Sequence, residues 1–288
     1  MQPFGIDAET VTKLFLSPDV NGVPTDMRKV PDTLARFCRP LLFHHNDPHF
    51  DMGYSGSSLL FRYRDRNFQL ACEHQLRVRN QPDLDPATSF LVFRRDGKPV
   101  GLSPIEVSRP RFGVDDDKTV DDLLLLSFDD VRDGHALTPH FWQLDLDHIA
   151  TLSDVPPQDV KLIFATGYPT SAADYEPTFD DDGNFISLNV VNRWAKLYLE
   201  PRPHGPLDVR HRVSLLVVER QHGNIGDPDG WSGSPVFFFW RSPGSAVQIG
   251  FAGMVTTANL DGRFALYPAA TIRGVVNGFL NTSGVEGG

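Results

Sequence analysis

A serine framed by glycines is the residue of this chain best suited to covalent chemistry. Residues 230–236 read Gly-Trp-Ser-Gly-Ser-Pro-Val, and an apolar run over 237–240 follows directly. Glycine permits backbone angles that a Cβ forbids, so a tight turn before a buried strand can expose the hydroxyl of Ser232. In such a turn the amides of Gly230 and Ser232 can point at one spot, which is the arrangement that an oxyanion needs.

A serine hydroxyl alone is a weak nucleophile, so the same chemistry requires a base and a residue that orients the base. His74 is the candidate base, because it follows a predicted β-hairpin. In that segment Leu59, Phe61 and Tyr63 alternate with mostly polar neighbours, residues 65–67 form a turn, and 68–72 form the second strand. His74 therefore lies where the hairpin ends.

Asp122 is the candidate orienting residue. It stands directly before four leucines at 123–126, which predict a buried strand. Acidic residues crowd this stretch, so Asp121 or Asp117 could orient the histidine instead. Asp122 would then be only an acidic residue that flanks a hydrophobic strand.

Three short motifs, taken in chain order, give the sequence a family resemblance. They are Ala71-Cys72-Glu73-His74, Asp122-Leu123-Leu124-Leu125-Leu126 and Gly230-Trp231-Ser232-Gly233-Ser234-Pro235. Together they resemble the motifs of trypsin/chymotrypsin-type serine proteases, and more closely those of the bacterial trypsin-like, HtrA-like branch. Weaker landmarks at 162–169, 253–257 and 263–268 follow the same family order, and the resemblance covers roughly residues 53–281.

The resemblance implies an all-β fold of two six-stranded antiparallel β-barrels of the chymotrypsin type. Residues 1–52 would be an N-terminal extension with short helices at 10–16 and 34–39. The first barrel would occupy 53–138, and the second barrel and a C-terminal helix 139–288, with the helix at 270–280. Abundant glycine and proline and short apolar runs also favour many strands and turns over long helices.

The resemblance also implies a role for each site residue. Ser232 would attack an acyl carbon, His74 would take its proton, and Asp122 would hold the histidine, with the oxyanion on the amides of Gly230 and Ser232.

Substrate contacts follow from the same resemblance. They would come from the strand Thr256, Thr257 and Ala258, which would pair with an extended peptide, and from Gly226 at the side-chain pocket. Asp227, beside Gly226, would favour basic side chains and Arg263 acidic ones, so the preference stays open. No cofactor and no metal are expected.

One departure from the family pattern concerns activation. In secreted zymogens of the resembled family, the residue before the nucleophile is an aspartate that pairs with a newly cut N-terminus. Here that residue is Trp231, which cannot accept an ammonium group. We therefore expect control by loop ordering or by a sensor or activator protein rather than by cleavage of a propeptide.

Charge and cysteine content indicate which partners to exclude and in which cellular compartment to expect the protein. The net charge is −10, which argues against nucleic acid or an anionic membrane as the main partner. The first residues lack the basic and apolar regions of a signal peptide, and there are only two cysteines, Cys38 and Cys72. Because secreted relatives usually carry several disulfides, these features favour a cytoplasmic protein.

Other functions remain as alternatives to an endopeptidase. A catalytically silent pseudoprotease that binds peptides or partners is one, and a protease that cuts only itself is another. His44, His45 and His49 invite a metal site but lack zinc-type spacing with cysteines, so a solvated loop is the better interpretation. We expect no PDZ module after the last helix, and by family association we expect an effector role in a bacterial stress or defence system.

Overall fold

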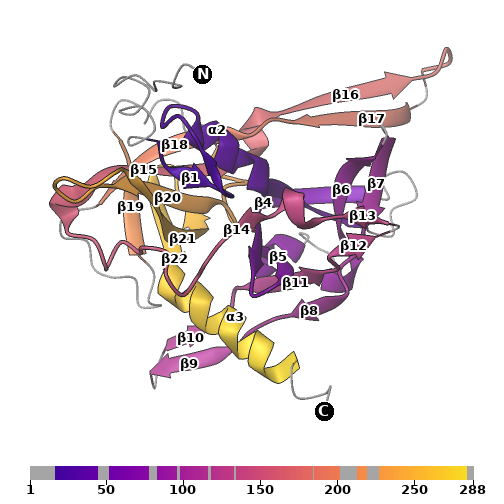
Figure 1. Cartoon of the computed structure of the whole chain (residues 1–288). Coiled ribbons are helices and arrows are strands. Elements are labelled where there is room, and N and C mark those ends of the chain that lie inside the picture. The colour runs from indigo at the N-terminus through magenta and orange to yellow at the C-terminus, as the bar shows by residue number, and fades with distance from the viewer. Residues whose placement is uncertain are drawn as a thin grey trace, which may run out of the picture.

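The computed structural model describes residues 17–44, 52–77, 83–95, 98–115, 118–132, 134–183, 185–201, 213–218 and 227–283. The expected short helix at 10–16, His45, His49, Asp117 and Gly226 lie outside the described residues. Figure 1 shows two groups of strands packed beside each other, with the C-terminal helix α3 (Ala269–Ser283) lying against both.

The first half of the chain contributes the following elements: β1 (Asp19–Val20), β2 (Val23–Pro24), α2 (Val30–Leu34), η1 (Ala35–Phe37), β3 (Cys38–His44), β4 (Met52–Tyr63), β5 (Arg66–Ala71), η2 (Glu73–Leu76), η3 (Pro86–Thr88), β6 (Ser89–Arg95), β7 (Lys98–Leu102), β8 (Glu106–Ser108), β9 (Phe112–Asp115), β10 (Lys118–Val120), β11 (Leu124–Phe128), β12 (Val131–Arg132), β13 (His135–Ala136), η4 (Thr138–His140) and β14 (Trp142–Gln143). The second half contributes η5 (Pro157–Asp159), β15 (Val160–Gly167), η6 (Thr170–Ala172), β16 (Ala173–Phe179), β17 (Phe185–Asn192), β18 (Ala195–Pro201), β19 (Val213–Val217), β20 (Pro235–Trp240), β21 (Gln248–Ala258), β22 (Arg263–Pro268) and α3. The η elements are single turns of 3₁₀-helix.

The two halves share one strand order. Strands β15, β18, β19, β22, β21 and β20 form a closed barrel in that spatial order. The first sheet runs β7-β6-β3-β4-β5-β11-β8, and β14 pairs in parallel with β4. If β3, β4, β5, β6, β8 and β11 are counted as strands one to six, their order is four-one-two-three-six-five, which is also the order in the closed barrel. The expected pair of chymotrypsin-type barrels is confirmed.

The first sheet differs in detail from the six strands expected. It carries β7 as an additional edge strand and β14 as a further partner, and within the described residues no pairing joins β8 to β6 or β7. This half is therefore a curved, partly open barrel, whereas the second barrel is closed.

The boundary expected between an extension and the first barrel, at 52/53, falls inside the first sheet. Strand β3, which lies before it, pairs with β4 over Cys38↔Leu59 to His44↔Met52 and also with β6. The short helix expected at 34–39 is wrong in its bounds, because α2 and η1 end at Phe37 and an extended strand begins at Cys38. Likewise β14 lies in the range expected for the second barrel but pairs with the first sheet.

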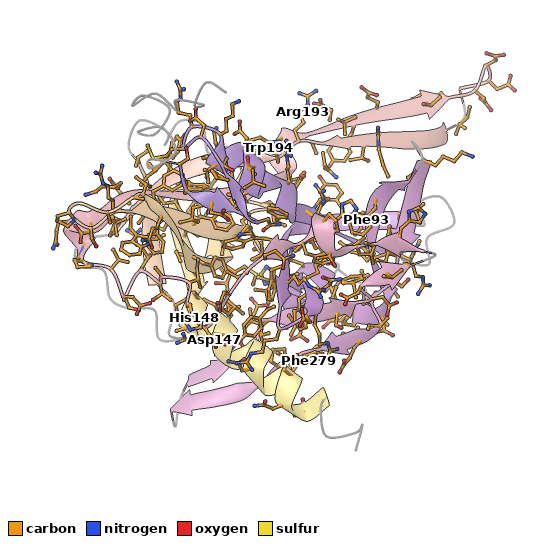
Figure 2. The ribbon with its side chains drawn as sticks, viewed as in Figure 1. Phe93, Asp147, His148, Arg193, Trp194 and Phe279 are labelled. Carbon is orange, nitrogen blue, oxygen red and sulfur yellow. The ribbon has the colours of Figure 1, made fainter. Side chains whose placement is uncertain are left out.

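Most of the buried apolar residues that the structure describes belong to three clusters. One fills the first barrel, and a second, with Trp231, fills the second barrel. The largest lies between the two sheets and against α3, which carries Phe279 (labelled in Figure 2). The ring of Phe279 meets that of Phe68 edge-on, with centroids 5.8 Å apart. The four-leucine segment is fully buried because Leu124 and Leu126 face the first barrel while Leu123 and Leu125 face the inter-barrel cluster.

Candidate active site

His74 lies at the end of the β4–β5 hairpin, as the sequence predicts, although the turn itself is one residue earlier than expected. Arg64 and Asp65 form that turn with positive φ angles of 45° and 60°. The chain then leaves β5 and enters η2, which carries His74. His74 therefore directly follows the end of β5, and the buried faces of β4 and β5 set the register of that strand.

Asp122 holds His74 from the loop before β11. Its two carboxylate oxygens lie 2.9 and 2.8 Å from Nδ1 of His74, and Oδ1 also accepts the His74 backbone amide at 3.0 Å. The side chain of Asp122 is 15% exposed, whereas Asp121 points to solvent. Of the two neighbouring aspartates, Asp122 is thus the one that contacts the histidine.

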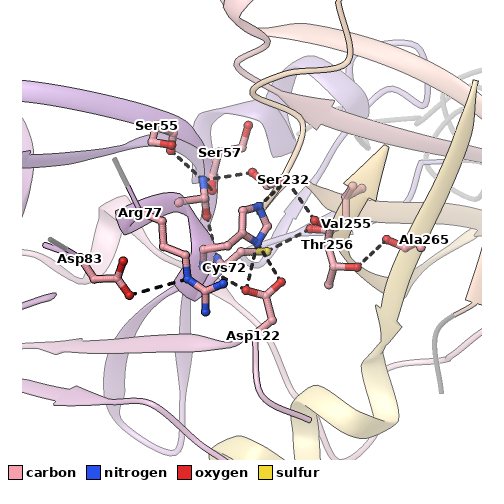
Figure 3. Close-up of polar contacts among 12 residues, drawn as sticks. Ser55, Ser57, Cys72, Arg77, Asp83, Asp122, Ser232, Val255, Thr256 and Ala265 are labelled. Carbon is pink, nitrogen blue, oxygen red and sulfur yellow. Dashed lines mark hydrogen bonds and ion pairs between the residues drawn. The ribbon is translucent and has the colours of Figure 1, made fainter. Parts of the chain in front are cut away.

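Ser232 completes the group from the other barrel. Its Oγ lies 3.0 Å from Nε2 of His74 and 3.0 Å from the carbonyl oxygen of Thr256. With Nδ1–H donated to Asp122, the neutral imidazole presents Nε2 as an acceptor, which is the tautomer that can take the serine proton. In Figure 3, Ser232 is directed toward Thr256, and Asp122 lies on the opposite side of the site.

The nucleophile turn is shaped by two glycines with positive φ angles. Gly230 has φ 87° and Gly233 has φ 81°, values that favour glycine. A Cβ on Gly230 would lie 2.6 Å from the carbonyl oxygen of Tyr168, and one on Gly233 would lie 1.8 Å from the carbonyl oxygen of Ser57. Both glycines are therefore required by close backbone contacts as well as by conformation.

The two peptide groups that carry the candidate oxyanion amides are fixed by their carbonyls. The carbonyl of Asp229, whose peptide includes the Gly230 amide, accepts the amide of Thr170 at 3.0 Å. The carbonyl of Trp231, whose peptide includes the Ser232 amide, accepts the amide of Ser234 at 3.0 Å. In a trans peptide the N–H points opposite to the C=O, so both amides face away from these contacts. Within the described part of the chain, neither amide donates to an acceptor.

Trp231 is buried beneath this turn. Its side chain is 2% exposed and its ring meets that of Phe264 edge-on, with centroids 5.9 Å apart. Gly167, from the landmark Gly-Tyr-Pro segment, allows this packing, because a Cβ there would lie 2.9 Å from the indole and 2.2 Å from Oγ of Ser234. The indole thus occupies the interior of the second barrel, packed against Phe264.

Thr256, Thr257 and Ala258 form the end of β21. Thr256 is fully buried, and its hydroxyl donates to the carbonyl of Ala265 at 3.1 Å (Figure 3). Strand β20 begins at Pro235, opposite Met254, so among the described residues it offers no partner to the three residues beyond Val255. That edge lies beside Ser232, where an extended peptide could pair with it. Gly226 lies outside the described residues, and Arg263 is an exposed residue at the start of β22.

Two residues near the site were not found from the sequence. Ser57 donates its hydroxyl to the carbonyl of Gly230 at 2.9 Å and accepts the amide of Tyr168 at 2.8 Å, and its own amide donates to the carbonyl of Ser232 at 2.8 Å. Gln75 contacts the same carbonyl of Ser232. Both act on backbone groups, so no residue-type pattern in the sequence reveals them.

The group of Cys72, His74 and Asp122 could in principle present ligand atoms to a metal, since these atoms lie within 4.8 Å of one another. Both carboxylate oxygens of Asp122 already contact the imidazole, and the thiol of Cys72 donates to the carbonyl of Val255 at 3.4 Å. The donor set is thus engaged within the protein, and its contacts fit a proton relay.

Comparison with known proteins assigns no family to the chain. No family model matches it, and no curated protein matches it either. Among solved structures it is similar to one titled human heparin binding protein, with 17% identity, a TM-score of 0.46, and coverage of 85% of this chain and 92% of that one. This level of similarity assigns no activity to the chain.

Proposed function

We propose that this protein is a serine endopeptidase that cleaves peptide bonds through an acyl-enzyme. The contact that carries the proposal is the 3.0 Å approach of Ser232 Oγ to Nε2 of a histidine whose Nδ1 lies 2.8 Å from Asp122. A nucleophile, a base and an orienting carboxylate in this sequence of contacts form the constellation used in acyl transfer.

The first half-reaction forms the acyl-enzyme. Ser232 Oγ attacks the carbonyl carbon of the scissile bond while Nε2 of His74 takes the hydroxyl proton. The resulting oxyanion lies where the amides of Gly230 and Ser232 converge, and Asp122 stabilises the imidazolium. The C–N bond then breaks, and His74 returns its proton to the leaving amine.

The second half-reaction releases the acyl group. Water attacks the ester carbonyl while His74 removes a proton from it, and the C–O bond to Ser232 breaks as His74 gives that proton back to Oγ. Within the described residues, β20 pairs with no residue of β21 beyond Met254, and this supports an extended peptide as the substrate, because such an edge supplies backbone hydrogen-bonding groups.

We also propose a cellular compartment for this activity. Both cysteines are buried thiols, and burial raises the pKa of the Cys38 thiol to about 12, so it stays protonated and unreactive at neutral pH. Thiols that form no disulfide suit the cytoplasm, where a bacterial trypsin-like protein of the HtrA-like branch could act as an effector under a separate sensor protein. Among the described residues, no helix is both long enough and apolar enough to cross a lipid bilayer.

A peptide library tests the proposed reaction. We expect the wild-type protein to generate new carboxyl and amino termini in a defined mixture of peptides, read by mass spectrometry, and Ser232→Ala to generate none. Equal cleavage by both proteins would overturn the proposal. Absence of peptide cleavage, together with a shortened chain in the wild type and a full-length chain in Ser232→Ala by intact mass, would indicate a protease that cuts only itself. Full-length chains in both proteins would favour a peptide-binding pseudoprotease.

A further inference from the structure

Gln75 follows the candidate base directly and is almost completely buried, with 4% of its surface exposed. Its Oε1 accepts the backbone amide of Cys72 at 2.7 Å. Its Nε2 lies 2.7 Å from the carbonyl oxygen of Ser55, 3.0 Å from that of Ser57 and 3.2 Å from that of Ser232. The orientation of the amide is fixed, because a backbone N–H requires the oxygen and carbonyls require the NH₂ group.

These contacts join three separate parts of the site. Cys72 begins the turn that carries His74, Ser55 and Ser57 belong to β4, and Ser232 comes from the second barrel. The carbonyl of Ser232 also accepts the Ser57 amide at 2.8 Å, and the next amide, of Gly233, donates to Val255 at 2.8 Å. The peptide group that follows the nucleophile is therefore held at both its oxygen and its nitrogen.

The Gln75 amide fits into the site because residue 56 of the neighbouring backbone has no side chain. Gly56 has a φ of 55°, and a Cβ placed there would lie 2.4 Å from Nε2 of Gln75 and 2.8 Å from the carbonyl oxygen of Ser232. Any other residue at 56 would displace the Gln75 amide or the nucleophile turn. The position of the Gln75 amide thus depends on the glycine at residue 56.

We propose that Gln75 is a positioning residue that locks the turn bearing His74 to the main chain of Ser232 across the junction of the two barrels. The inference rests on the proposed function, since it concerns the same nucleophile. Gln75 does not touch the reacting atoms. It acts by keeping Nε2 of His74 within hydrogen-bonding distance of Ser232 Oγ, and displacements of about 1 Å in such a geometry can cost 10²-fold in rate.

The test measures how fast a fluorophosphonate labels Ser232 in the full-length chain, with the rate of the covalent step separated from reagent affinity. Gln75→Met keeps the length of the side chain and removes its hydrogen bonds. We expect the covalent rate constant to fall by about 10- to 100-fold while the half-saturating reagent concentration stays unchanged. Gly56→Ala, whose Cβ would press on both this amide and the Ser232 carbonyl, should lower the rate as well.

Gln69→Met is the matched control. Gln69 is also fully buried on the neighbouring strand β5, but its Nε2 donates to Oγ of Ser58 at 2.8 Å, away from the nucleophile. This variant removes a buried amide of the same type from the first sheet and should keep the wild-type covalent rate. Rates are normalised to the folded fraction measured by near-ultraviolet circular dichroism. If Gln75→Met does not fold, Gln75→Asn, which keeps an amide but is one methylene too short to make all of these contacts, carries the same expectation.

The outcomes separate this inference from the proposed function. A labelled wild type with an equally fast Gln75→Met would overturn the positioning role and leave the proposed function in place. An equal loss of rate in Gln69→Met would also overturn it, since the effect would then follow stability alone. A wild type that is not labelled at all would overturn the proposed function, and the inference with it.

Discussion

At the scale of single residues, the site depends on which carboxylate faces the imidazole. The three motifs were sufficient to find His74, Asp122 and Ser232, because residue types with strand-end context identify candidates for acyl transfer. They could not choose between Asp121 and Asp122, since neighbouring residues on an irregular segment can point in any direction. The structure brings Asp122 to Nδ1 of His74 and leaves Asp121 in solvent.

Asp122→Asn tests this assignment. An asparagine keeps the shape but can donate its NH₂ group to Nδ1, which selects the tautomer with Nε2 protonated and unable to accept the serine proton. We expect kcat/KM on a peptide substrate to fall by about 10⁴-fold, as loss of the correct tautomer does elsewhere. Asp121→Asn is the matched control and should retain the wild-type rate; a large loss in that variant would reverse the assignment.

At the scale of elements, the turn over 230–234 is the segment whose conformation matters most. Its glycines were identified from the sequence as turn residues, and both have positive φ. The contacts that fix it were not, because the carbonyls of the turn accept hydrogen bonds from Ser57 on β4 and from the amide of Thr170 at the start of η6, whose proximity depends on how the barrels pack. Strand β3 was missed for a related reason: Pro40 and the preceding helical signals obscured a segment that is extended because it pairs with β4 and β6.

Gly230→Ala tests the turn against a control of similar conformation. Gly230 and Gly244 have φ angles of 87° and 77°, so alanine costs each about 1–2 kcal/mol of backbone strain. A Cβ on Gly230 would also lie 2.6 Å from the carbonyl of Tyr168 and 2.7 Å from the amide of Thr170, whereas nothing lies within 4 Å of one on Gly244. We expect Gly230→Ala to lower kcat by about 10²–10³-fold, as loss of an oxyanion donor does, and Gly244→Ala to leave kcat unchanged. Equal kcat values in the two variants would show that the Gly230 peptide does not hold an oxyanion.

At the scale of the whole molecule, the two barrels share one buried cluster. It contains Phe61 and Phe68 from the first sheet, Phe237 and Phe251 from the second barrel, and Phe279 from α3. The all-β class and the paired barrels followed from the family resemblance. The open first sheet and the place of β14 did not, since edge pairing is decided by packing that short apolar runs do not encode.

A shared cluster predicts that the barrels unfold together. Phe61→Ala removes a fully buried ring from the first sheet and should lower the free energy of unfolding by about 3–5 kcal/mol. The tryptophans lie at 142, 194, 231 and 240, so their fluorescence reports chiefly on the second half of the chain. We expect their urea transition to shift as far as the far-ultraviolet circular dichroism transition does. A fluorescence midpoint that stays at its wild-type value would show that the barrels are independent.

The central claim is that His74 activates the hydroxyl of Ser232. Intact-mass and peptide mass spectrometry after treatment with a fluorophosphonate test it most directly, on the wild type, His74→Ala and Ser232→Ala in parallel. The account predicts one phosphonyl group on Ser232 in the wild type, a rate at least about 10³-fold lower in His74→Ala, and no adduct in Ser232→Ala. A folded wild type that stays unmodified, or that is modified equally fast without His74, would contradict it.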